Sequence, residues 1–245
     1  MLRWIAAPLA LSALALTATP ALAQQPDASV EVALRTGYAL PLGSLVSSTN
    51  LTDVLTGALP LWIDAGYRLP HLFLGAYLQY AQGFMIQGGA SGSTYLANGG
   101  IRASTSECGS LGQSCSGFDL KYGIEVQYHL APDGPLDPWL GYGVGAENLD
   151  VHSHGNAFGR SNFPVVSETQ SFMALVPVVL QLGADYRLAR FGIGPFVMLD
   201  LGPYITESQS TAGTTLTLHD TALHEWLTLG ARGYFDIALP TKGAP

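Results

Sequence analysis

Thirteen consecutive residues alternate between apolar and polar or small side chains without a break. In FDLKYGIEVQYHL, residues 118–130, one face would carry Asp119, Lys121, Glu125, Gln127 and His129, and the other face only apolar and aromatic side chains. Successive side chains of an extended strand point to opposite sides, so this period of two predicts a β-strand and excludes a helix. The apolar face would pack on a core in a soluble sheet or contact lipid in a membrane barrel.

Seven further stretches show the same alternation. We expect strands at residues 30–40, 58–69, 72–84, 140–147, 174–188, 191–201 and 226–239. Strands of about ten to thirteen residues are long for a soluble protein but suit a tilted strand that crosses a membrane. In the stretch 174–188 the alternation assigns Ala174 and Val176 to the outward face together with Leu180 and Leu182.

Two prolines interrupt these stretches. Pro177 and Pro195 fall inside strands of a sheet that, once closed, has no edge. Because proline cannot donate to a strand ladder, we expect a local bulge at each of them.

The connections between strands alternate in length. LPHL, APDGPLDP and LARF are short, whereas the links at about residues 41–57, 87–117, 149–172 and 203–224 are long and rich in Gly, Ser, Thr and Asn. Short periplasmic turns and long extracellular loops give this order in an outer-membrane barrel. The sequence therefore predicts an all-β fold, an eight-stranded antiparallel up-and-down transmembrane β-barrel with short periplasmic turns and four long extracellular loops.

Aromatic residues give an independent indication. They occupy outward positions beside both sets of connections, as in the two aromatic belts of a membrane barrel. Those near short turns are Tyr67, Tyr128, Tyr186 and Phe191, and those beside long loops are Tyr38, Phe84 and Phe118. A soluble lipocalin-like barrel would also alternate, but it would not need outward faces this apolar.

Composition agrees with a partly non-aqueous setting. The 245 residues are 48% hydrophobic and only 11% charged, against about a quarter charged in ordinary soluble domains. The net charge of -8 and the scattered Lys and Arg residues argue against a nucleic-acid partner, because phosphate binding needs clustered positive charge.

The first residues have the features of a secretory signal peptide. Arg3 precedes an apolar stretch, and Ala21-Leu22-Ala23 is a small-residue cleavage pattern, so we expect residues 1–23 to be removed before Gln24. The alternative is a single N-terminal membrane helix, which Pro8 and Pro20 disfavour. Residues 24–245 would then form one outer-membrane β-barrel domain, with its strands within about residues 30–239.

ALPLWIDAGYRL and VQYHLAPDGPLDPWLGYGVG resemble the small eight-stranded outer-membrane barrels of Gram-negative bacteria, the outer-membrane β-barrel domain family. The resemblance covers about residues 30–239. It implies location in the outer membrane, contact with outer-membrane lipids and insertion by the barrel assembly machinery. It implies no specific activity. The chain continues past Leu239 as PTKGAP, whereas such barrels typically end on an aromatic residue.

Charged residues recur on the inward parity. Eight strands enclose a lumen only wide enough for side chains, so charges of both signs should pair there. We expect a closed, salt-bridged interior, with a water-filled channel as the alternative. The predicted lumen network comprises Glu31, Arg35, Asp64, Arg68, Asp119, Lys121, Glu125, Glu147, Asp185, Arg187, Asp200, Arg232 and Asp236.

Candidate chemistry outside the lumen is sparse. Cys108 and Cys115 are close in sequence in an exported chain and predict a local disulfide. Asp150, His152, His154, His219 and His224 could contribute to a metal site, but no spacing defines a ligand set, so we interpret the histidines as solvated loop residues. The G-x-G-x-x-A match at residues 141–146 lies within a strand, where it offers no helix N-terminus to a dinucleotide. We expect no cofactor and no metal.

The leading functional hypothesis is a non-enzymatic outer-membrane barrel with a structural or surface-interaction role through its loops. A small pore or solute-binding barrel is one alternative, and an outer-membrane lipid-modifying enzyme is another. No G-x-S-x-G or H-E-x-x-H pattern marks a catalytic centre.

Overall fold

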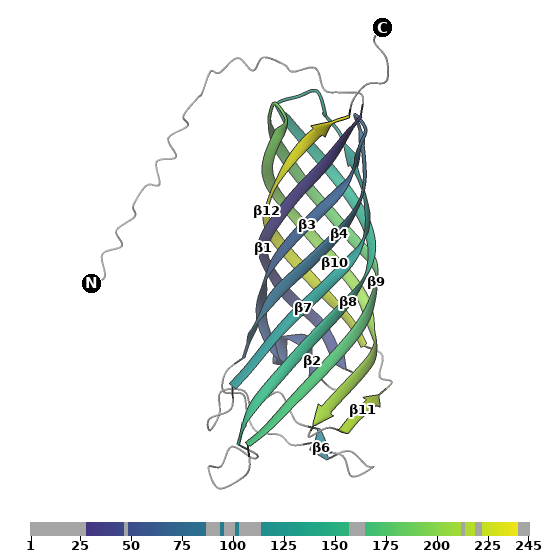
Figure 1. Cartoon of the computed structure of the whole chain (residues 1–245). Coiled ribbons are helices and arrows are strands. Elements are labelled where there is room, and N and C mark those ends of the chain that lie inside the picture. The colour runs from purple at the N-terminus through teal and green to yellow at the C-terminus, as the bar shows by residue number, and fades with distance from the viewer. Residues whose placement is uncertain are drawn as a thin grey trace, which may run out of the picture.

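Eight long strands form one barrel in the computed structural model (Figure 1). The structure describes residues 28–46, 49–86, 94–95, 101–102, 114–156, 165–211, 214–218 and 222–239. The barrel strands are β1 (Ser29–Val46), β3 (Leu55–Arg68), β4 (Leu72–Met85), β7 (Ser114–His129), β8 (Leu136–Asn156), β9 (Val165–Leu188), β10 (Phe191–Thr211) and β12 (Ala222–Ala238). The short elements are β2 (Thr49–Asn50), the 3-10 helix η1 (Leu51–Asp53), β5 (Thr94–Tyr95), β6 (Ile101–Arg102) and β11 (Thr214–Leu218). Within the described part of the chain, no helix is long and apolar enough to cross a membrane.

Every barrel strand pairs antiparallel with its neighbours, and β12 returns to pair with β1. That last ladder runs from Ser29 opposite Ala238 to Gly43 opposite His224, so it closes the sheet along most of its height. The first and last described residues lie at the end of the barrel that carries the short turns (Figure 1). The predicted eight-stranded up-and-down barrel is confirmed. We refer to the short-turn end as periplasmic and to the opposite end as extracellular.

The outward face carries a broad apolar belt. Ile124 and Leu182, both on this face, are 63% and 64% exposed. Exposure of so many large apolar side chains is unfavourable in water and is expected where lipid replaces water. Aromatic side chains stack toward the extracellular side of the belt. Tyr80 and Phe118, on the neighbouring strands β4 and β7, have ring centroids 5.9 Å apart, and Tyr38 of β1 stacks on Phe84 of β4 at 6.1 Å across Gly57 of the intervening β3.

The strands continue further than the sequence pattern predicted. β8 extends to Asn156 and β9 begins at Val165, so most of the expected 149–172 loop is strand. β10 likewise extends to Thr211, within the expected 203–224 link. These extensions still alternate, but their inward positions carry apolar side chains such as Leu149 and Val151 beside polar ones such as Gln170 and Glu207, and the outward side chains of β8 and β9 are mostly polar. The alternation of apolar outward positions therefore predicted these strands to be shorter than they are.

One proline produces the expected bulge and the other does not. Gly143 pairs with Val179 and Gly145 with Val176, so β9 carries one extra residue beside Pro177. This bulge reverses the parity of β9, and the prediction that Ala174 and Val176 face outward is wrong: they are inward and almost fully buried. At Pro195 the predicted bulge is absent. The ladder with β9 omits residues 194 and 195 but resumes at Phe196 in the same register, so the missing donor leaves a gap without an insertion.

Candidate functional site

Charged side chains gather inside the barrel in three groups along its length. The charged residues predicted to face the lumen all point inward, and all are buried except Arg187, which is half-buried. Burial of this many charges is tolerable only when each meets opposite charge or hydrogen-bonding partners. The contacts within each group show how this is achieved.

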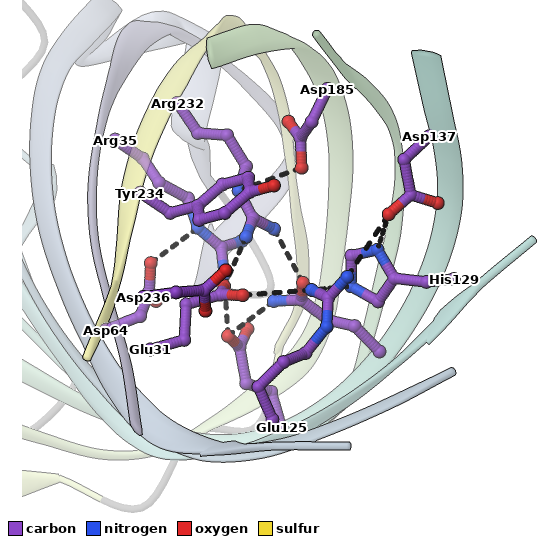
Figure 2. Close-up of polar contacts among 12 residues, drawn as sticks. Glu31, Arg35, Asp64, Glu125, His129, Asp137, Asp185, Arg232, Tyr234 and Asp236 are labelled. Atoms are coloured by element: carbon purple, nitrogen blue, oxygen red, sulfur yellow. Dashed lines mark hydrogen bonds and ion pairs between the residues drawn. The ribbon is translucent and has the colours of Figure 1, made fainter. Parts of the chain in front are cut away.

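The periplasmic group is centred on Arg68, and Figure 2 shows its partners Glu31, His129 and Asp137. Its Nη1 donates to Glu31 at 2.9 Å and to Nε2 of His129 at 2.7 Å, and its Nη2 donates to Asp137 at 3.1 Å. Since arginine only donates, His129 accepts at Nε2 and donates from Nδ1 to Asp137, 2.9 Å away. Arg232 donates to the other oxygen of Glu31 at 2.6 Å. Glu31 thus bridges two guanidinium groups from different strands.

Arg187 lies at the periplasmic end of the lumen, beside this group. Its Nε donates to the hydroxyl of Tyr234 at 2.8 Å, and its Nη1 donates to the carbonyl of Pro132 in the turn between β7 and β8. Its Nη2 lies 3.8 Å from Asp236, which accepts a hydrogen bond from Ser29 at 3.1 Å. The first and last strands are therefore joined by side chains at this end as well as by the ladder.

The middle group surrounds Arg35. Its guanidinium donates to Asp64, Glu125 and Gln181 at 2.6, 2.6 and 2.7 Å. Gln181 donates in turn to the second oxygen of Glu125 at 2.7 Å, and Gln127 donates to the first at 2.8 Å. Arg35 and these partners come from β1, β3, β7 and β9, so this group ties opposite walls of the barrel together.

The extracellular group is acidic around a single ammonium. Lys121 Nζ lies 2.9 Å from Asp200, 3.3 Å from Glu147 and 3.6 Å from Asp119. Glu147 also accepts hydrogen bonds from Tyr204 at 2.8 Å and from the Trp226 indole at 3.1 Å. Lys121 lies 5.1 Å from the centre of the Trp226 ring, which adds a cation–π contact.

His224 belongs to this group, and its interpretation as a solvated loop residue is wrong. It is fully buried in β12, its Nε2 lies 2.9 Å from Glu147, and its ring stacks on Tyr204 with centroids 3.9 Å apart. The strand extension explains the error, because β12 begins at Ala222 instead of near residue 226. His219 lies outside the described residues. His152 and His154 lie on outward positions of β8, and no group of three metal-binding side chains occurs among the described residues.

Besides His224, several polar residues of the network were not identified as site residues from the sequence, among them Gln127, His129, Asp137 and Gln181. A signal existed for three of them, because Gln127, His129 and Gln181 share the inward parity of their strands. Asp137 lies next to a short turn, where alternation is too brief to assign a face.

An apolar cluster covers the extracellular group. Leu51 of η1 and Val54 fold into the mouth of the barrel and are almost fully buried. They belong to one cluster with Leu149, Val151 and Phe172 from β8 and β9 on the extended part of the barrel. Together with Leu55, Met85, Tyr204 and Trp226, these residues form what we call the apolar cap.

Cys115 packs against the apolar cap and is disulfide-bonded. Cys108 lies outside the described residues, so the Cys108–Cys115 pairing stays a prediction.

The charged groups leave little free space. The gap lined by Arg35, Asp64, Lys121, Glu125 and Asp200 is too narrow for a water molecule. Trp62, Tyr77 and Met198 fill the rest of its wall. At this gap, charged and apolar side chains of the described strands fill the lumen.

Comparison with known proteins places the fold. No family model matches the chain, and no curated protein matches it by sequence. Among solved structures, a major outer membrane protein from Thermus thermophilus is similar, with 16% identity, a TM-score of 0.50, and coverage of 85% of this chain and 99% of that one. OprG from Pseudomonas aeruginosa also aligns, with 11% identity, a TM-score of 0.43, and coverage of 86% and 98%. The protein has the fold of a small outer-membrane β-barrel. With its closed strand cylinder and exposed apolar belt, it is a protein of the outer membrane, in contact with membrane lipid.

Proposed function

We propose that this protein is a closed, non-enzymatic barrel that anchors an extracellular surface in the outer membrane. The observation that carries the proposal is the filling of the lumen at successive levels. At the periplasmic level, Arg68 and Arg232 both pair with Glu31. Arg35 pairs with Glu125 in the middle, and Lys121 pairs with Asp200 beneath the apolar cap. A barrel closed in this way can hold strands and loops in place at the cell surface without carrying solutes.

The buried ion pairs support a permanently closed lumen, because breaking each of them would cost free energy. The side chains of Arg35, Asp64 and Glu125 are at most 2% exposed, so separating them would leave buried charges without partners. The apolar cap supports the same conclusion from the other side, since Leu51 and Val54 would have to enter water for the mouth to open.

Planar-bilayer recording tests the proposal directly. We expect no steady ion current from the refolded wild-type protein, with slower gel migration after heating verifying that the inserted barrel was folded. A large and stable conductance would reject the closed barrel and favour the small-pore alternative. A parallel assay for acyl-chain release from labelled outer-membrane lipid should give no product, and product formation would instead favour the lipid-modifying enzyme.

A further inference from the structure

The outward face of the barrel changes from apolar to polar at its extracellular end. Below this point the outward side chains are apolar and the inward ones polar. Above it, Val151 and Phe172 are buried inside, while the neighbouring outward positions carry hydroxyl groups and histidine. β7, β8, β9 and β10 continue side by side through this part of the molecule.

Two rows of outward side chains cross these four strands in register. The upper row pairs Ser116 with His152, His152 with Thr169, and Thr169 with Ser210. The lower row runs from Phe118 through Asp150 and Ser171 to Ser208. We call the polar members of both rows the hydroxyl wall.

The hydroxyl wall is continuous with the lipid-facing belt. Tyr80 stacks on Phe118 at 5.9 Å between centroids, and Phe118 stacks on His152 at 5.7 Å, so one ladder of rings runs from the belt into the upper row. His152 Nδ1 lies 2.9 Å from the hydroxyl of Thr169, and Ser171 donates to Asp150. These contacts hold the polar side chains in a regular array. Whatever lies against the belt below therefore also lies against this wall above.

The chemistry of the wall fits uncharged hydroxyl groups better than phosphate. Residues 114–118, 150–156, 165–173 and 206–211 contain no Lys or Arg, and the wall includes the carboxylate of Asp150. Phosphate recognition uses arginine and lysine. Serine and threonine hydroxyls both donate and accept, as sugar hydroxyls do, and the rings of Phe118 and His152 offer flat faces for packing.

We propose that the hydroxyl wall binds the oligosaccharide headgroups of glycolipids in the outer leaflet. This inference deepens the proposed surface role and rests on it. Sugar hydroxyls would hydrogen-bond to Thr169, Ser171, Ser208 and Ser210, while the acyl chains of the same lipid contact the apolar belt directly below. Glycolipid molecules would then line the β7–β10 side of the barrel.

The test compares two glycolipids in vesicles that contain the full-length mature protein. One vesicle set contains lipopolysaccharide with its core sugars, and the other contains the same lipid trimmed to its phosphorylated lipid A. After extraction of the barrel with its surrounding lipid into polymer-bounded discs, mass spectrometry gives the ratio of glycolipid to phospholipid. We expect enrichment of the core-bearing lipid around the wild-type barrel and little enrichment of lipid A.

A variant that combines Thr169→Val, Ser171→Ala, Ser208→Ala and Ser210→Ala should show an enrichment about fivefold lower than the wild-type protein. This is the effect of about one net hydrogen bond. The matched control is Thr36→Val, which removes an exposed outward hydroxyl within the lipid belt and should leave the enrichment unchanged. Heat-modifiable migration verifies that both variants fold.

Equal enrichment of lipid A and core-bearing lipid would overturn the proposal, as would an unchanged ratio in the wall variant. Dimers of the wild-type protein that the wall variant abolishes, without glycolipid enrichment, would assign the wall to a second copy instead. None of these outcomes affects the expected absence of conductance, so failure of the wall proposal is separable from failure of the closed-barrel proposal.

Discussion

Single charged side chains in the lumen differ in how much of the network depends on them. Arg35 donates to three side chains from three other strands and is 2% exposed, whereas Arg187 is half-buried near the periplasmic opening. Removing the first leaves Asp64 and Glu125 as buried carboxylates without their cation. Removing the second leaves Asp236 near water, where the loss is partly offset by hydration.

Arg35→Ala should therefore lower the free energy of unfolding by about 3 to 5 kcal/mol, as expected when one partner of a buried ion pair is removed. Arg187→Ala is the matched control and should have a clearly smaller effect. Reversible denaturant unfolding in lipid vesicles measures both. Equal losses for the two variants would show that burial does not set the strength of the lumen contacts.

Among the strands, β9 shows how one insertion changes an element. The bulge beside Pro177 assigns opposite faces to residues that a strict period of two would place together. Leu182 faces lipid in the lower part, whereas Ala174, also even-numbered, is inside the barrel. This reversal puts Phe172 in the apolar cap and Ser171 on the outer surface. Without the extra residue, Phe172 would lie on the outer surface of the barrel and Ser171 inside it.

Introduced cysteines would test this reversal. In otherwise wild-type protein, a lipid-soluble thiol reagent should label Leu175→Cys, because Leu175 is 54% exposed, and should leave Ala174→Cys unlabelled, because Ala174 is 0% exposed. The native cysteines should not react if they form the expected disulfide. Strong labelling at position 174 with protection at 175 would mean that β9 keeps one parity throughout and has no bulge.

The whole barrel is divided along its axis into a lipid-facing belt and an extracellular part whose outward side chains are mostly polar. Along β7 the outward positions of the belt run from near Phe118 to Leu130, the residue just after the strand, with Ile124 halfway between them. The penalty for a charge on this face should depend on depth, because lipid replaces water most completely at the centre of the bilayer.

Ile124→Arg should thus destabilise the barrel by about 2 to 4 kcal/mol, and Leu130→Arg, at the periplasmic edge of the belt, by about 0 to 1 kcal/mol. Both native side chains are exposed, at 63% and 55%, so neither substitution disturbs internal packing. Unfolding titrations in vesicles provide the comparison. A larger penalty at Leu130 would place the bilayer centre elsewhere along the strand.

The number of barrel strands, their antiparallel order and the inward position of the charges were all predictable from the sequence. Each of these depends on alternation along a single strand, which lipid makes conspicuous by requiring apolar side chains at every outward position. FDLKYGIEVQYHL alone shows which residues face lipid and which face the lumen. The length of the connections then orders the strands, because short turns can join only neighbouring antiparallel strands.

The pairing of charges required the closed barrel. Arg35 meets Asp64 and Glu125 across 29 and 90 residues of sequence, and the relative stagger of the strands determines those contacts. The ends of the strands were equally hidden, because the apolar outward signal stops where lipid stops, while hydrogen bonding between strands continues. His224 and Leu149 became interior residues for this reason, and the hydroxyl wall appeared only when four extended strands were seen in register. Local alternation records the solvent on each face of a strand, whereas closure of the sheet determines which side chains meet.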